Sequence, residues 1–183
     1  MVASRSRPQR IVLVGFMGCG KSTVGAALAR RLGWGFRDLD RWIEERHGLT
    51  VAEIFRGRGE PFFRGEERRA ARAAARLKRH VVAAGGGAFA QDKTRELLRA
   101  GAITVWLRCD PAVLRRRLPA DGSRPLAVDR GRMRRLLGER EPSYRLADIT
   151  VDSSRAAPDE VAQRIAEAAF TRAGPARRTA KKR

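Results

Sequence analysis

The sequence is poor in cysteine and in aromatic residues, and it has no long apolar run. Its 183 residues include two cysteines, and aromatic residues make up 6% of the chain. These cysteines, Cys19 and Cys109, provide neither the framework of a disulfide-stapled protein nor the ligand spacing of a zinc site. The apolar runs are far shorter than the about 20 residues that a membrane-spanning helix needs, and none has the form of a signal peptide. We therefore expect a cytoplasmic protein with no membrane partner.

Acidic residues are also scarce. The chain has 20 of them against 40 lysines and arginines, which gives a formal net charge of +20. Such an excess is typical of nucleic-acid-binding proteins. However, nine of the basic residues lie at the two ends, three within residues 1–10 and six within residues 172–183. The others lack interleaved aromatic residues on which bases could stack. The composition therefore predicts no specific nucleic-acid partner.

Short apolar runs alternate with helical segments along the chain. Strands that alternate with helices pair in parallel through right-handed crossovers. The sequence thus predicts an α/β fold, a three-layer sandwich with a five-stranded parallel sheet. Its length fits one domain, expected over 10–171, between an N-terminal tail (1–9) and a disordered basic tail (172–183). The expected strands are 11–14, 35–38, 80–84, 102–107 and 148–151, and the expected helices are 22–32, 41–47, 50–56, 61–79, 92–100, 111–118, 129–140 and 158–170.

The segment Gly15–Thr23 fits the phosphate-binding pattern G-x-x-x-x-G-K-[ST]. It follows an apolar strand and opens a helix, a context in which glycines let backbone N–H groups approach phosphate oxygens. Lys21 would supply a point charge to the outer phosphates, and the Ser22 hydroxyl would ligate Mg²⁺. Cys19 is expected to be a small filler within this loop. The candidate ATP-binding residues here are Gly18, Cys19, Gly20, Lys21, Ser22 and Thr23.

Two carboxylates and a glycine triplet follow strands of the predicted sheet. Asp38 and Asp40 stand at the end of the second strand, where alternation along a strand places both on the same face. At the carboxyl end of a parallel strand, one of them would hold Mg²⁺ through water and the other would accept a proton from a substrate hydroxyl. The alternative for Asp40 is a helix cap for the segment that begins at Arg41. The triplet Gly85–Gly87 follows a buried strand. Glycines at such a place are typical of a binding-site floor, where a ligand lies directly against the backbone.

Taken with three further motifs, these features resemble shikimate kinase. The resemblance runs in order and with matching spacing from about residue 10 to residue 170. It implies a P-loop fold of the nucleoside-monophosphate-kinase type. The motifs are the phosphate loop, Asp38-x-Asp40, Gly59-Glu60-x-x-Phe63-Arg64, Gly85-Gly86-Gly87, Arg124-Pro125-Leu126 and Arg140-x-Pro142-x-Tyr144.

The resemblance implies transfer of a phosphoryl group from MgATP to the 3-hydroxyl of shikimate, on the path to chorismate and the aromatic amino acids. Asp40 would hold the reacting hydroxyl and act as its base or orienter. Asp38 would hold Mg²⁺ through water, with Ser22 as the direct ligand. Arg64 and Arg140 would clamp the shikimate carboxylate, because planar guanidinium groups suit that geometry. Gly86 would contact the substrate through its backbone.

The resemblance also implies a lid near 112–125. Arg117 would be a catalytic group, with Lys21, and Arg124 would bind ATP; both would lie on or beside the lid as it closes over the phosphates. The segment Ser154–Pro158 matches the family's adenine-binding end only in part, which leaves Arg155 without an assigned role. We expect a monomer with shikimate and ATP as its small-molecule partners and Mg²⁺ as its cofactor.

Two other functions fit parts of the pattern. Another small-molecule kinase of the same fold, of the gluconate or nucleoside-monophosphate type, would share the phosphate loop and the sheet. Asp40, Arg64, Gly86 and Arg140 as a set favour a hydroxylated carboxylate as acceptor instead of a nucleotide. A non-catalytic nucleotide switch or a nucleic-acid-binding module is supported by the net charge alone.

Overall fold

The computed structural model describes residues 8–118 and 130–171. Five strands form one parallel sheet in the order β2-β3-β1-β4-β5, as the sequence predicts. The strands are β1 (Arg10–Val14), β2 (Gly35–Asp38), β3 (His80–Ala83), β4 (Ile103–Arg108) and β5 (Ile149–Asp152). The helices are α1 (Lys21–Leu32), α2 (Leu39–His47), α3 (Val51–Ala74), α4 (Asp92–Arg99), α5 (Pro111–Arg117), α6 (Arg130–Tyr144) and α7 (Pro158–Thr171), with a short 3₁₀ helix η1 (Ala88–Ala90).

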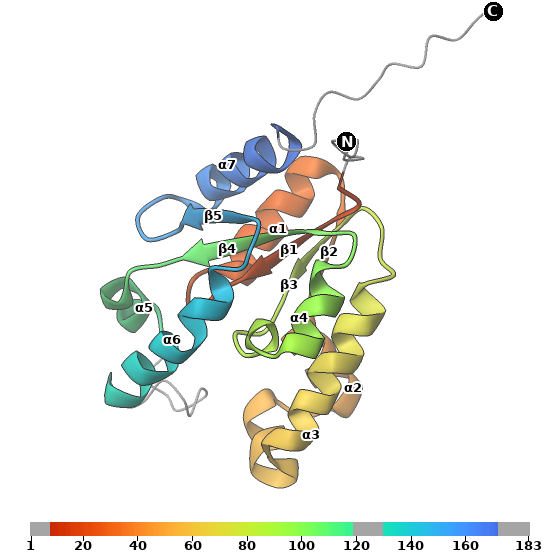
Figure 1. Cartoon of the computed structure of the whole chain (residues 1–183), viewed down its shortest axis with the longest axis vertical. Helices are drawn as coiled ribbons and strands as arrows, with labels where there is room; N and C mark the ends of the chain where they lie inside the picture. The colour runs from red at the N-terminus through yellow and green to blue at the C-terminus, as the bar shows by residue number, and fades with distance from the viewer. Residues whose placement is uncertain (1–7, 119–129, 172–183) are drawn as a thin grey trace, which may run out of the picture.

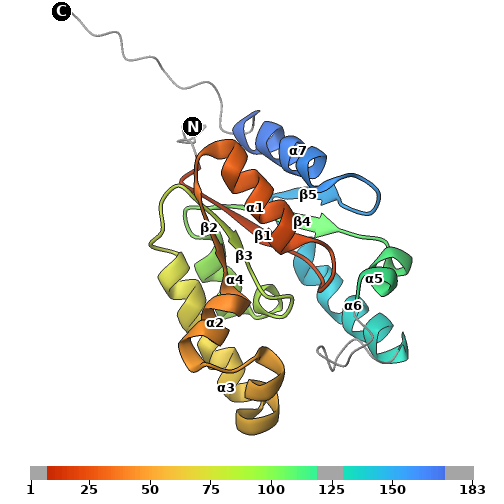
Figure 2. The ribbon, with the colours of Figure 1, turned by 180° about the vertical axis from the view of Figure 1, so that it is seen from behind.

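Helices cover the sheet on both faces. Figures 1 and 2 show α1 and α7 side by side on one face, with α4 and α6 on the other. Trp34, which follows α1, packs edge-on against Phe170 of α7 with ring centroids 6.1 Å apart. The arrangement is the expected three-layer sandwich.

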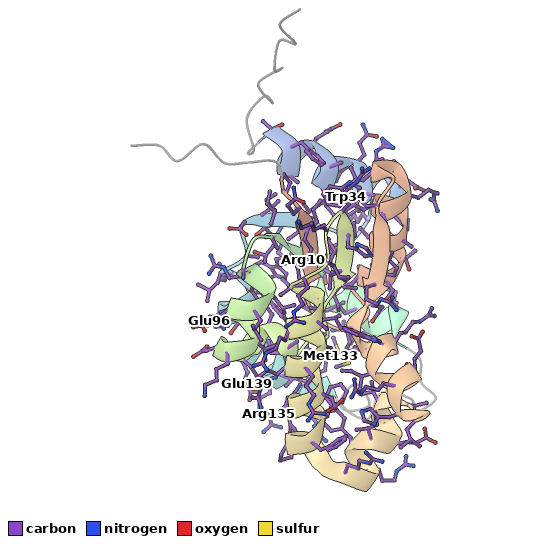
Figure 3. All side chains as sticks on the ribbon, turned by 90° about the vertical axis from the view of Figure 1, so that its right-hand side faces the viewer. Arg10, Trp34, Glu96, Met133, Arg135 and Glu139 are labelled. Carbon is purple, nitrogen blue, oxygen red and sulfur yellow. The ribbon has the colours of Figure 1, made fainter. Side chains whose placement is uncertain are left out.

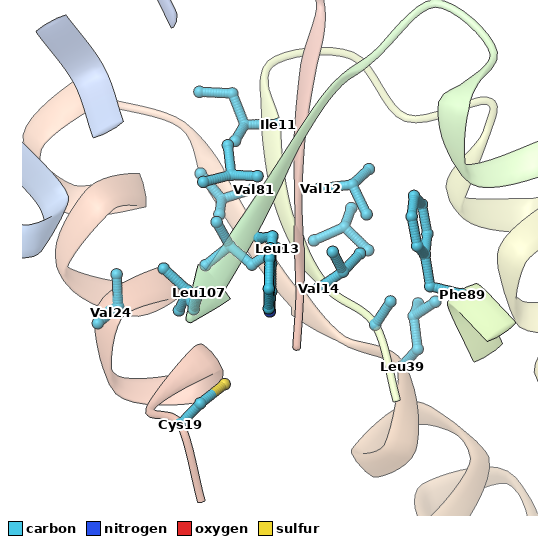
Figure 4. Close-up of a cluster of buried hydrophobic side chains, with 14 of the residues drawn as sticks. Ile11, Val12, Leu13, Val14, Cys19, Val24, Leu39, Val81, Phe89 and Leu107 are labelled. Atoms are coloured by element: carbon cyan, nitrogen blue, oxygen red, sulfur yellow. The ribbon is translucent and has the colours of Figure 1, made fainter. Parts of the chain in front are cut away.

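The central strand β1 forms the middle of the core. Its side chains from Ile11 to Val14 are fully buried, because helices lie on both faces of the sheet. Figure 4 shows Ile11 and Leu13 on the side of Val24 of α1, and Val12 and Val14 on the side of Phe89. The carboxyl end of this strand leads directly into the phosphate loop, so a fully buried strand carries that loop.

Helix α2 begins earlier than the sequence predicts. The strand β2 ends at Asp38, and the helix starts at Leu39, so Asp40 lies in the first helical turn. The expectation that strand alternation puts Asp38 and Asp40 on one face is therefore wrong. The cap is also Asp38 and not Asp40, since the Asp38 side chain accepts from the backbone N–H groups of Asp40 and Arg41.

Helix α3 contains the break that the sequence predicts between its two helical segments. Gly59 adopts φ 76° and ψ 168°, which is not helical, and Pro61 follows it. The second half ends at Ala74 instead of residue 79. Thr50 and Glu53 form a capping box at the start of α3, and Asp110 caps α5 ahead of Pro111.

Arg10 is buried, although by sequence it counts with the basic N-terminus. It is 3% exposed and donates hydrogen bonds to the backbone carbonyls of Ala75, Leu77 and Ala100. Figure 3 shows it inside the body of the molecule, whereas Glu96 projects from α4. Burial lowers the pKa of the Arg10 guanidinium. This side chain ties the start of β1 to the ends of α3 and α4.

Some predicted features lie outside the described residues. These are most of the N-terminal tail, the lid residues 119–125 with Arg124, and the basic tail 172–183. Within residues 8–118 and 130–171, no helix combines the length and the apolar character needed to cross a bilayer.

Candidate active site

The phosphate loop joins β1 to α1 through glycines with positive φ. Gly15, Gly18 and Gly20 have φ of 140°, 80° and 96°. A β-carbon on Gly15 would stand 2.7 Å from the carbonyl oxygen of Leu107, so a side chain has no room there. Gly20 caps α1 without a side-chain hydrogen bond, and the first turn holds no acidic residue. The first backbone N–H groups of α1 are thus left for an anion.

Lys21 bends back over this loop. Its Nζ donates to the carbonyl oxygens of Gly15 at 2.9 Å and Phe16 at 3.0 Å. Cys19 is fully buried beneath the loop, as expected of a filler. The ammonium group is therefore held beside the helix N-terminus, where it adds a full positive charge to the partial charge of the helix.

Ser22 and Asp38 connect the phosphate loop to the end of β2. The Ser22 hydroxyl donates to Oδ2 of Asp38 at 2.5 Å. The other oxygen of Asp38, Oδ1, accepts from the backbone of Asp40 at 3.1 Å and Arg41 at 3.4 Å. A hydroxyl and a carboxylate beside a phosphate site are oxygen ligands of the kind that Mg²⁺ prefers. In the described residues no cluster of three or more histidines, cysteines or acids forms a metal cage.

The glycine triplet at the end of β3 brings the other candidate residues together. A β-carbon on Gly85 would lie 2.5 Å from Oδ1 of Asp40 and 2.9 Å from Oε1 of Glu67. A β-carbon on Gly87 would collide with the guanidinium of Arg64. On Gly86 it would lie 3.2 Å from Nη1 of Arg140 and 3.5 Å from the carbonyl oxygen of Gly15. The triplet is thus a floor without side chains, and it lies beside the phosphate loop.

Arg64 is held on α3 by two carboxylates. Its Nη1 donates to Oε2 of Glu67 at 2.7 Å, and its Nε and Nη2 donate to Oε1 of Glu60 at 2.9 and 2.5 Å. Burial acts to lower the pKa of Arg64, but the two carboxylates outweigh it, so the pKa is raised. Burial also raises the pKa of Glu67, against the opposing effects of Arg64 and Gln91. Gln91 donates to Glu67 at 3.1 Å.

Arg140 and Tyr144 lie on successive turns of α6. Arg140 is 6% exposed, with Cζ 5.8 Å from the centroid of the Phe16 ring. Tyr144 is fully buried, hydrogen-bonds Arg140, and donates to the carbonyl oxygen of Gly86 at 2.5 Å. Burial raises the pKa of the Tyr144 hydroxyl, which keeps it a donor. Tyr144 therefore fixes both the floor and the guanidinium above it.

Arg117 lies apart from this group. At the end of α5 it donates from Nη2 to the carbonyl oxygens of Ser153 at 3.2 Å and Ser154 at 3.1 Å, and its Nη1 is 3.8 Å from Sγ of Cys109. The Ser153 hydroxyl in turn donates to the carbonyl of Cys19 at 3.0 Å. Arg117 thus reaches the phosphate loop through one intervening residue. Arg155 lines a cavity of about 780 Å³ whose wall also includes Trp106, Pro111 and Phe16 of the phosphate loop.

The partners of Arg64 are not among the predicted site residues. Glu60 and Glu67 stand four residues before and three residues after it, the spacings at which helical side chains meet. That signal was present in the segment Gly59–Glu67. The contact of Gln91 and the role of Tyr144 in fixing Gly86 depend on tertiary packing and left no local signal.

Comparison with known proteins gives consistent matches. A family model described as shikimate kinase matches residues 17–170. A shikimate kinase of Moorella thermoacetica is 47% identical over 165 residues, covering 88% of this chain and 94% of that protein. The solved structure of shikimate kinase from Acinetobacter baumannii in complex with shikimate has a TM-score of 0.86 and 36% identity, covering 90% of this chain and 94% of the other. The shikimate kinase from Aquifex aeolicus has a TM-score of 0.81 and 32% identity, with coverage of 90% and 98%.

Proposed function

This chain belongs to the shikimate kinase family, and we propose that it transfers the γ-phosphoryl group of ATP to the 3-hydroxyl of shikimate. The observation that carries this proposal is how close the two halves of the site lie to Gly86. A β-carbon on Gly86 would be 3.5 Å from the carbonyl oxygen of Gly15 in the phosphate loop, and 3.2 Å from Arg140 on the acceptor side. A donor phosphate and an acceptor hydroxyl therefore meet on this floor.

The acceptor would be oriented by its carboxylate and its hydroxyl. Arg64 and Arg140 supply two guanidinium groups for the carboxylate, and the backbone of Gly86 supports the ring. The nearby carboxylate of Asp40 would take the proton of the 3-hydroxyl as O3 attacks the γ-phosphorus. The bond from that phosphorus to the β,γ-bridging oxygen breaks. Its electron pair stays on that oxygen, and ADP leaves.

The phosphates would be held by the N–H groups of the loop and by Lys21. Phosphoryl transfer depends mainly on positioning and charge stabilisation, and Lys21 would stabilise the negative charge of the transferred group. Arg117 is proposed to assist after movement of its helix, and Arg124 to contact ATP. Thr23, Cys19 and the loop glycines complete the proposed ATP site.

Mg²⁺ is proposed as the cofactor, with Ser22 as its direct ligand and Asp38 as a ligand through water. The ion would neutralise charge on the phosphate oxygens. The 2.5 Å hydrogen bond between the Ser22 hydroxyl and Asp38 supports this pairing, because it holds the two oxygens side by side at the phosphate loop. We further propose a single kinase domain over 10–171 that acts as a monomer in the cytoplasm.

An acceptor panel tests the proposed function. The full chain is incubated with MgATP and shikimate, quinate, gluconate or AMP, and ADP release is followed. Shikimate-dependent ADP release well above that of the other acceptors is expected. The matched control is Lys21→Met, which should release no acceptor-dependent ADP. Release with gluconate or AMP but not with shikimate would overturn the proposal.

A further inference from the structure

The two carboxylates that hold Arg64 differ in their access to solvent. The Glu67 side chain is 3% exposed, whereas the Glu60 side chain is 60% exposed. Glu67 binds Nη1 of Arg64, and Glu60 binds the edge formed by Nε and Nη2. The edge that faces solvent is therefore occupied by the carboxylate that can leave.

The rest of the Arg64 guanidinium is enclosed by fixed groups. The backbone of Gly87 lies against it, and the rings of Phe55 and Phe63 have centroids 5.9 Å from Cζ. These contacts fix the position of the guanidinium. They do not hold Glu60, so another carboxylate can replace it on the Nε–Nη2 edge. That edge presents two parallel N–H donors, which is the geometry that carboxylates bind.

Charge balance favours exchange at this position. Arg64 already faces two carboxylates, and bringing a third beside them would place like charges together. If the incoming carboxylate takes the place of Glu60, the number of charges around Arg64 stays the same. We propose that Glu60 is an internal carboxylate that occupies the substrate's place on Arg64, and that the carboxylate of the acceptor displaces it.

The local backbone allows this exchange. Glu60 follows the non-helical Gly59 and precedes Pro61, so it lies at the start of the second half of α3. When it turns to solvent, its negative charge remains near a helix N-terminus, where it is stabilised. Glu60 thus lowers the affinity for the acceptor, because each binding event must break its ion pair. The inference rests on the proposed function, since it assumes an acceptor with a carboxylate.

The test is the dissociation constant of shikimate, measured by calorimetry in the absence of ATP for the wild-type chain, Glu60→Gln and Glu60→Ala. An exposed ion pair is weak, so its loss should tighten shikimate binding by about 2–5-fold. The KM for shikimate should fall similarly, with kcat unchanged. The matched control is Glu96→Gln, which removes the same charge from an exposed site on α4 and should leave the affinity unchanged. A second ligand, the uncharged methyl ester of shikimate, should gain nothing from either Glu60 substitution.

Two results would overturn the inference. Unchanged or weaker shikimate binding in both Glu60 variants would mean that Glu60 only positions Arg64. An equal gain in affinity for the methyl ester would mean that the substitutions act by enlarging or reshaping the site, and not by removing a carboxylate that the ligand must displace. If the wild-type chain binds no shikimate, the proposed function itself fails, and the inference fails with it.

Discussion

A β-carbon on Gly85 would lie 2.5 Å from Oδ1 of Asp40. The backbone of Gly85 is not in the left-handed region, so the missing side chain is required by this contact and not by the conformation of the chain. The glycine at the end of β3 therefore makes room for the carboxylate that we propose as the base.

Gly85→Ala should move that carboxylate without unfolding the protein. Displacement of a reacting group by about 1 Å costs on the order of 100-fold in rate, so we expect a loss of that size in kcat. The control is Gly57→Ala, whose added β-carbon meets nothing within 4 Å. Steady-state kinetics and circular dichroism of both variants check the prediction. A kcat for Gly85→Ala within a few-fold of wild type would contradict it.

Asp40→Asn should abolish turnover while ATP binding survives. A positioned general base contributes about 10²–10⁴-fold, and an amide cannot accept the proton. The measurements are single-turnover rates and the dissociation constant of ATP, with Asp92→Asn on α4 as a matched control at an exposed position. If turnover stays within a few-fold of wild type, Asp40 is not the base.

Arg10→Met should reduce stability and leave catalysis unchanged. The arginine donates to three backbone carbonyls at the amino end of β1, the end away from the phosphate loop. Loss of charged hydrogen bonds to buried carbonyls should lower the free energy of unfolding by about 2–4 kcal/mol. Denaturant titration measures it, and the exposed Arg76→Met is the control. A loss of kcat equivalent in free energy to the loss of stability would contradict the claim that the amino end of β1 does not affect catalysis at its carboxyl end.

The buried Glu67 should make stability depend on pH in a defined direction. Its folded pKa lies above its ordinary value of 4.5, because burial disfavours the charged form. The folded chain therefore binds a proton more readily than the unfolded chain, and the contribution of Glu67 to stability falls as the pH rises from about 4.5 through the folded pKa. Glu67→Gln cannot titrate. The stability of this variant relative to wild type, measured as the free energy of unfolding, should thus be higher at pH 7 than at pH 4.5. An opposite trend would mean that Arg64 outweighs burial.

The sheet, its strand order and the residues of the phosphate loop could be predicted because their signals are local. Apolar runs mark the strands, and the glycines, Lys21 and Ser22 mark the loop. Helix ends were less predictable where two short-range preferences compete. Asp38 could end a strand or cap a helix, and it does both, which moves the start of α2 to Leu39.

Long-range contacts of charged residues could not be predicted from local pattern. Arg10 stands in a basic N-terminal stretch, yet three carbonyls from the ends of other elements draw it into the interior. Glu60 belongs to a motif that the sequence displayed, but its place on the open edge of Arg64 depends on the break at Gly59 and on the walls formed by Gly87 and the phenylalanines.

The most direct test of the account is the identity of the product. Wild-type chain, MgATP and shikimate are incubated together, and the product is examined by two-dimensional phosphorus–proton NMR. We predict one phosphomonoester, formed in equal amount to ADP, whose phosphorus couples to the proton on C3 of shikimate. ADP formed without a shikimate phosphate, or phosphorus coupled to the proton of another carbon, would contradict it.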